Sequence, residues 1–140
     1  MDNGATIWIV EDDPSTQRII AEHLRAHHFV PVLFDTAEKA YAALRAASTK
    51  PGTSELPSLI ILDMLLPGMS GVDLIRLIKQ NGAWEKIPVV VVTVLSREES
   101  FGTDPDVNSA FWLNKPFDAN NLIQTIQDVL STVGQREKGS

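Results

Sequence analysis

Five side chains suited to chemistry each stand at the end of a short apolar run of the sequence. Two carboxylates follow the first run, one follows the third, a hydroxyl ends the fourth and an amine follows the fifth: Glu11, Asp12, Asp63, Thr93 and Lys115. Short apolar runs bounded by turn residues are typical of buried parallel strands. Because ligands bind at the carboxyl ends of parallel strands, we expect these side chains at one edge of a sheet.

Three carboxylates gathered at one edge repel one another. Each pair at about 4 Å costs on the order of 4 kcal/mol at an effective dielectric constant of about 20. A hard divalent cation with oxygen ligands would offset this repulsion. Mg²⁺ with several retained waters suits an open crevice, so the sequence predicts a magnesium site.

The same residues suit one reaction. Asp63 can attack a phosphoryl group as a nucleophile and form an aspartyl phosphate. Mg²⁺ and the Lys115 ammonium would neutralise charge on the transferring oxygens, and Thr93 would supply a hydroxyl donor. We therefore interpret Asp63 as a candidate phosphoacceptor.

The elements that must position these residues alternate along the chain. β-Branched, aliphatic and aromatic runs predict strands at 6–10, 29–34, 59–62, 89–93 and 110–113. Apolar residues at helical spacing predict helices over 14–26, from 37, over 72–80 and after 118. This alternation predicts an α/β, flavodoxin-like fold: a doubly wound five-stranded parallel sheet of order 2-1-3-4-5 with helices on both faces. In that order the first and third strands are neighbours, which brings Glu11, Asp12 and Asp63 together.

Local signals add detail to this pattern. Asp13, Thr36 and Asp118 each precede a predicted helix and are suited to cap it. Pro31 suggests that the second strand lies at the edge of the sheet. Gly102 and the Asp-Pro pair at 104–105 predict that residues 96–108 form only a short or irregular helix.

The composition bounds the class of protein. The chain has 140 residues and is expected to form one domain over 1–134, with a flexible tail at 135–140. Its net charge of −6 argues against direct binding to nucleic acid or to an anionic membrane surface. There is no cysteine, no apolar run of membrane-spanning length and no signal-peptide pattern at the N-terminus. The sequence therefore predicts a cytoplasmic protein without membrane insertion.

With these residues and elements, the chain resembles the response-regulator receiver domain, the CheY-like phosphoacceptor module of two-component signalling. Four motifs carry the resemblance in the same order: VEDDP at 10–14, LDMLLPGMSG at 62–71, VVT at 91–93 and KPF at 115–117. The resemblance covers about residues 5 to 133. It implies the same fold and a phosphorelay function.

The resemblance also implies a role for each matching residue. Asp63 would accept phosphate from a phosphohistidine of a sensor histidine kinase or a histidine phosphotransfer protein. Alongside Asp63, Asp12 would bind Mg²⁺ directly, Glu11 would bind it through water, and Leu65 would offer its backbone carbonyl.

Other matching positions imply a switch. Thr93 and the Val94 amide would hold phosphoryl oxygens, and Lys115 would pair with the phosphoryl group. The resemblance also implies a cis peptide bond between Lys115 and Pro116, an isomer that costs far less before proline than before other residues. After phosphorylation Thr93 would move toward the phosphate and Trp112 would turn inward. That change would remodel the face formed by the fourth helix, the fifth strand and the fifth helix, where an output protein would bind.

The acidic run permits two alignments with the family motif. We assign Glu11 and Asp12 as the metal pair because Pro14 fits the start of the helix, which leaves Asp13 as its cap. Val94 is larger than the small residue that usually follows the threonine in the family.

The positions that flank incoming water in family members are both apolar in this chain. They are occupied by Leu65 and Leu95. Because leucine cannot orient a water molecule, the sequence predicts that the phosphoryl group is longer-lived than with polar residues there.

Two other functions compete with this interpretation. One is an adaptor that keeps the fold and works without phosphorylation. The other is an Mg²⁺-dependent phosphatase that uses an aspartyl phosphate. Such enzymes need a second aspartate two residues after the nucleophile as acid and base, and Leu65 stands there. We therefore expect no enzyme activity beyond self-phosphorylation and autodephosphorylation.

Overall fold

One parallel sheet organises the chain. A computed structural model describes residues 4–48, 56–96, 105–108 and 110–139. Its strands pair in parallel in the order β2-β1-β3-β4-β5, which confirms the predicted topology. The strands are β1 (Thr6–Val10), β2 (Val30–Phe34), β3 (Leu59–Leu62), β4 (Val89–Thr93) and β5 (Phe111–Asn114).

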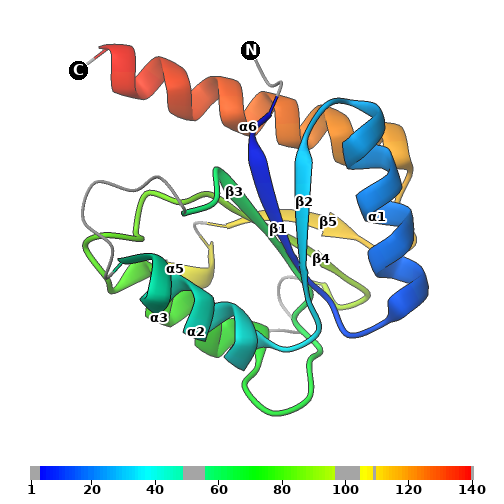
Figure 1. Ribbon diagram of the computed structural model, residues 1–140, viewed down its shortest axis with the longest axis horizontal. Coiled ribbons are helices and arrows are strands. Elements are labelled where there is room, and N and C mark those ends of the chain that lie inside the picture. The colour runs from blue at the N-terminus through cyan, green and yellow to red at the C-terminus, as the bar shows by residue number, and fades with distance from the viewer. Residues whose placement is uncertain (1–3, 49–55, 97–104, 109, 140) are drawn as a thin grey trace.

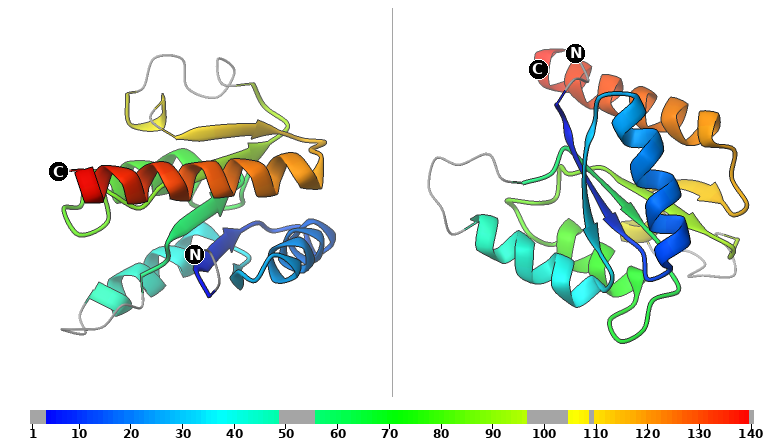
Figure 2. Two further views of the ribbon diagram at one scale, coloured as in Figure 1. Left: turned by 90° about the horizontal axis from the view of Figure 1, so that it is seen from above. Right: turned by 45° about the vertical axis from the view of Figure 1, so that its right-hand side comes forward.

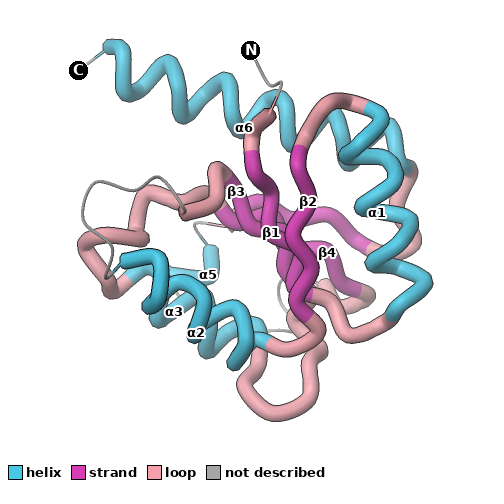
Figure 3. Tube along the Cα trace, in the orientation of Figure 1, coloured by secondary structure: helices cyan, strands magenta, loops and turns pink. Residues whose placement is uncertain are grey.

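Helices cover both faces of the sheet (Figures 1 and 2). They are α1 (Pro14–Ala26), α2 (Ala37–Ser48), α3 (Gly71–Lys79), α5 (Pro105–Asn108) and α6 (Ala119–Gly139). Successive residues of a strand point to opposite faces, so β1 contributes to two cores. Ile7 and Ile9 pack with α1 and α6, whereas Trp8 and Val10 pack with α2 and α3. Figure 3 shows the strands in magenta between these two helical layers.

The two central strands are buried throughout. Every residue of β3 and β4 is buried, because strands flank each of them on both sides and helices cover both faces. This explains why both read as unbroken apolar runs in the sequence. β2 lies at the edge, as predicted from Pro31, which has no amide hydrogen to donate.

The three predicted helix caps are confirmed. Asp13 Oδ2 accepts a hydrogen bond from the Thr16 amide at 3.0 Å, and Thr36 Oγ1 accepts from the Lys39 amide at 3.1 Å. Asp118 Oδ1 likewise accepts from the amide of residue 120 at 2.8 Å. Each contact satisfies an amide that the first turn of a helix leaves without a backbone partner.

The last helix is longer than its apolar stripe, which was traced only to residue 133. A flexible tail was predicted over 135–140, and α6 is helical to Gly139; its flexibility stays a prediction. The prediction took polar composition as the end of the helix. Residues 135–138 are Gln, Arg, Glu and Lys, which are good helix formers, and a single glycine at 134 costs only about 1 kcal/mol.

The segment before β5 agrees, over its described residues, with the prediction of a short or irregular helix. The helix α5 has only four residues. Residues 97–104, which belong to the same predicted short or irregular segment, lie outside the described residues. None of the helices in the described ranges has the length and hydropathy that crossing a membrane would require.

Candidate functional site

The three carboxylates singled out in the sequence meet at the carboxyl ends of β1 and β3. Val10 and Leu62 are paired across these strands, and the Asp63 amide donates to the Val10 carbonyl at 3.1 Å. The residues after the pair therefore emerge side by side. One oxygen from each of Glu11, Asp12 and Asp63 lies within 4.8 Å of the other two. Glu11 and Asp63 are buried, whereas Asp12 is exposed.

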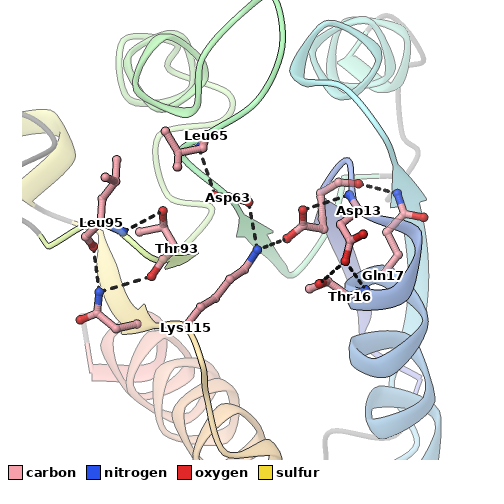
Figure 4. A network of polar contacts seen from close by, with 10 residues as sticks. Asp13, Thr16, Gln17, Asp63, Leu65, Thr93, Leu95 and Lys115 are labelled. Atoms are coloured by element: carbon pink, nitrogen blue, oxygen red, sulfur yellow. Dashed lines mark hydrogen bonds and ion pairs between the residues drawn. The ribbon is translucent and has the colours of Figure 1, made fainter.

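Lys115 bridges two of these carboxylates. Its Nζ donates to Glu11 Oε1 at 2.6 Å and to Asp63 Oδ2 at 3.0 Å. Figure 4 marks the contact between Lys115 and Asp63 with a dashed line. It comes from the end of β5, and the peptide bond between Lys115 and Pro116 is cis, as predicted. The ammonium thus supplies the positive charge that the carboxylates need.

Burial and pairing shift the proton affinities of this bridge. Burial raises the pKa of the Glu11 carboxyl above its ordinary value, although the hydrogen bond from Lys115 opposes that rise. Burial lowers the pKa of the Lys115 ammonium, but its hydrogen bonds to Glu11 and Asp63 outweigh burial and leave that pKa raised. Both shifts favour the protonated form, of the Glu11 carboxyl and of the Lys115 amine respectively.

The Asp63 carboxylate is oriented by two donors. Its Oδ2 accepts from Lys115, and its Oδ1 accepts from the Leu65 amide at 3.0 Å. Leu65 belongs to the loop between β3 and α3, so the conformation of that loop fixes one side of the carboxylate. The Leu65 side chain is itself exposed.

The hydroxyl and the indole predicted for the switch contact one loop. Thr93 is fully buried, and its Oγ1 accepts from the Leu95 amide at 3.4 Å. The indole nitrogen of Trp112 donates to the Leu95 carbonyl at 3.3 Å, and the Trp112 side chain is half-buried. Val94, which lies between Thr93 and Leu95 in the chain, is exposed. Thr93 and Trp112 are thus linked through the residues that follow β4.

Asp13 has a separate use in the structure. It caps α1, is exposed and does not belong to the carboxylate group of Glu11, Asp12 and Asp63. Its hydrogen bonds with Thr16 hold the pKa of the Asp13 carboxyl below its ordinary value. Asp13 thus stands apart from the three carboxylates that lie together, and the assignment of Glu11 and Asp12 as the metal pair stays a prediction.

Two residues near the site were missed in the sequence. Asn114 donates through Nδ2 to the Leu95 carbonyl at 2.8 Å and to the Thr93 carbonyl at 3.3 Å. The Gln17 amide group donates to the Glu11 carbonyl. The Asn114 contacts have no local sequence signal, because β4 and β5 meet only through the sheet topology. The Gln17 contact is local, since it joins the first turns of α1 to the end of β1 across six residues, but glutamine at that spacing has no specific signature.

The missing side chain at Gly71 allows the start of α3 to lie close to the backbone that follows β3. A Cβ at this position would lie 2.8 Å from the Asp63 carbonyl oxygen and 2.8 Å from Met64 Cα. We expect Gly71→Ala to lower the free energy of unfolding by about 1–3 kcal/mol, since backbone atoms must move. Urea unfolding measures this loss. Gly82→Ala is the matched control, because a Cβ at Gly82 has no neighbour within 4 Å. Equal stability of the two variants would contradict the role of Gly71.

The carboxylate group is chemically suited to a metal ion. It offers three hard oxygen donors at one crevice, one of them exposed, which matches the preference of Mg²⁺ for a few carboxylates plus water. Lys115 already supplies one positive charge, so a divalent ion would complete the neutralisation of three carboxylates.

Comparisons with known proteins agree with this geometry. The family model described as the response regulator receiver domain matches residues 7–127. The phosphate regulon transcriptional regulatory protein PhoB of Pseudomonas aeruginosa is 28% identical over 131 residues, which are 94% of this chain and 54% of PhoB. The chain therefore spans about half the length of that relative.

Two solved structures show the same fold. A sensor protein from Polaromonas sp. JS666 is 27% identical, with a TM-score of 0.76 over 92% of this chain and 98% of the other. The response regulator protein TrrA of Thermotoga maritima, solved in complex with Mg²⁺ and BeF, is 20% identical, with a TM-score of 0.73 over 89% of this chain and 98% of the other.

Proposed function

The chain belongs to the family of response regulator receiver domains, and we propose that Asp63 accepts a phosphoryl group in a His-Asp phosphorelay. This proposal rests on one observation: the Lys115 ammonium pairs with both Glu11 and Asp63, two buried carboxylates of the group that also includes Asp12. A purely structural aspartate at the end of β3 would need neither the lysine nor the other carboxylates.

The proposed transfer uses groups already in place. A carboxylate oxygen of Asp63 forms the new O–P bond while the P–N bond of a phosphohistidine breaks. The imidazole nitrogen keeps the bonding electron pair and takes up a proton. The Lys115 ammonium lies beside Asp63 and neutralises charge on the transferring oxygens, while the Leu65 amide keeps the carboxylate oriented.

Glu11, Asp12 and Asp63 are proposed to hold Mg²⁺, with the Leu65 carbonyl as a further ligand. When bound, the ion would supply positive charge for the phosphoryl oxygens. The Thr93 hydroxyl and the Val94 amide are the proposed donors on the other side of the phosphoryl group.

A route from the site to a binding surface is also proposed. A phosphoryl oxygen would offer a strong acceptor to the O–H of Thr93, and the side chain would turn away from the Leu95 amide, from which Oγ1 accepts in this structure. Because Trp112 and Asn114 both donate to the Leu95 carbonyl, the loop cannot move without changing β5. The face formed by α5, β5 and α6 would then change its affinity for an output protein, as a shift between two populations.

The partners follow from this chemistry. The donor would be a phosphohistidine on a sensor histidine kinase or a histidine phosphotransfer protein. The output would be another protein rather than nucleic acid bound directly, since the net charge is −6. The exchange is proposed to occur in the cytoplasm. Turnover of external substrates is not part of the proposal, because Leu65 cannot act as an acid or base.

Incubation with acetyl phosphate and Mg²⁺, followed by intact mass spectrometry, tests the proposal. We expect one added phosphoryl group, which chelation of the metal prevents. If neither acetyl phosphate nor a panel of phosphorylated histidine kinases gives an adduct, the phosphoacceptor proposal fails. The phosphorylation-independent adaptor would then be favoured.

The lifetime of the phosphorylated protein tests the prediction that Leu65 and Leu95 slow its hydrolysis. We expect the double variant Leu65→Asn with Leu95→Glu to lose its phosphoryl group about tenfold faster, a change that corresponds to about 1.4 kcal/mol in the barrier. The reason is that polar side chains can orient the attacking water. Decay of the intact mass measures the rate, and Leu33→Asn on the exposed edge strand is the control. An unchanged lifetime would contradict the prediction.

A further inference from the structure

The loop between β3 and α3 carries groups that the site depends on. It begins at Asp63, and its Leu65 amide orients the Asp63 carboxylate at 3.0 Å. At its far end Ser70 caps α3, where Ser70 and Asp73 exchange side-chain to backbone hydrogen bonds. Between these ends the loop runs along the outside of the molecule, beside the first turn of α2 (Figures 1 and 2).

A contact from α2 holds the middle of this loop. Glu38 Oε2 accepts a hydrogen bond from the Met69 amide at 2.9 Å, across 31 residues of sequence. The neighbouring Gly68 has a φ of +74°, and a Cβ there would lie within 2.3 Å of Glu38 Oε2. The left-handed backbone and the missing side chain at Gly68 thus permit the carboxylate to approach.

We propose that Glu38 is a positioning residue for the phosphoacceptor site. This inference rests on the proposed function of Asp63. Among the described residues, the Glu38 side chain is hydrogen-bonded to the Met69 amide and does not belong to the group of Glu11, Asp12 and Asp63, so it acts through the loop. By fixing Met69, it limits the conformations of residues 65–69, and therefore keeps the Leu65 amide on Asp63 and the Leu65 carbonyl in one place.

The charge of Glu38 can also stabilise α2, and this effect must be separated from the hydrogen bond to Met69. Glu38 lies in the first turn of α2, where a carboxylate also interacts favourably with the helix dipole. Glu38→Gln removes that charge but keeps an oxygen that can accept from Met69. Glu38→Ala removes both the charge and the acceptor, and alanine is a good helix former, so the helix should persist.

The test combines Mg²⁺ titration by calorimetry with the rate of phosphorylation by acetyl phosphate at subsaturating Mg²⁺. For Glu38→Ala we expect Mg²⁺ binding and the phosphorylation rate to fall by about fivefold, the factor that one ordinary hydrogen bond controls. Glu38→Gln should stay within about twofold of wild type. Lys39→Ala is the matched control, since Lys39 is exposed on the same turn and its ammonium pairs with the exposed Asp35.

The outcomes separate this inference from the proposed function. If the wild type accepts phosphate and Glu38→Ala matches it in both assays, the inference is overturned. If Glu38→Gln lowers Mg²⁺ binding and the phosphorylation rate as much as Glu38→Ala does, the charge rather than the hydrogen bond is responsible. The positioning role is then also overturned. If the wild type binds Mg²⁺ but accepts no phosphate, the proposed function fails, while weakened Mg²⁺ binding in Glu38→Ala alone still supports the positioning role.

Discussion

Asp63→Asn takes up no phosphoryl group from acetyl phosphate in the presence of Mg²⁺, whereas the wild type gains one. This is the expected result because an amide oxygen cannot replace the carboxylate as nucleophile. The fold should persist, since asparagine has nearly the same size and can still accept from the Leu65 amide through its carbonyl oxygen. Intact mass measures the adduct, and circular dichroism confirms that the variant is folded.

Neighbouring carboxylates provide the matched controls. Asp13→Asn should accept phosphate normally, because asparagine can cap α1 as aspartate does and residue 13 is outside the acidic group. Asp12→Asn should need more Mg²⁺ for the same rate, because one proposed ligand is lost. An adduct on Asp63→Asn, mapped to another carboxylate, would refute the assignment of the acceptor. Equal effects of the Asp12 and Asp13 variants would refute the assignment of the metal pair.

Most of the fold could be predicted because strand burial leaves a clear pattern. β3 and β4 are covered on both faces, so every residue is apolar except the terminal Thr93, and both strands were placed at their observed bounds. α1 was likewise bounded by a proline at its start and a cap before it. The end of α6 was not found, because residues 135–138 are all polar and polar composition does not distinguish a helix from a coil.

The site was predictable only in part. The acidic residues and Lys115 could be placed together because each directly follows a strand whose position in the sheet was predicted. The side chains that hold the loops could not. Glu38 reaches Met69 from a different element, and Asn114 reaches Leu95 across the end of the sheet. Such contacts depend on side-chain direction after folding, which alternation and spacing do not encode.

The largest expected effect on stability comes from Lys115→Met without metal. The variant keeps most of the aliphatic side chain but leaves Glu11 and Asp63 without their shared cation, and both carboxylates are buried. Removing one partner of a buried ion pair typically costs about 3–5 kcal/mol, because the remaining charge is uncompensated. We expect a loss of that order in the free energy of unfolding, measured by urea denaturation with a chelator present.

Mg²⁺ should restore much of that loss, which links the stability of the site to its proposed metal. An ion that binds only the folded state stabilises it in proportion to the logarithm of its concentration over its dissociation constant. The increase on adding Mg²⁺ should be larger for Lys115→Met than for the wild type, because three carboxylates then depend on the ion alone. Lys39→Met is the control, since its ion pair with Asp35 is exposed to solvent, where such pairs contribute little to stability. If Lys115→Met loses no more than that control, or gains no more from Mg²⁺ than the wild type, the bridge does not balance the acidic group. The charge argument for a metal at this site would then fail as well.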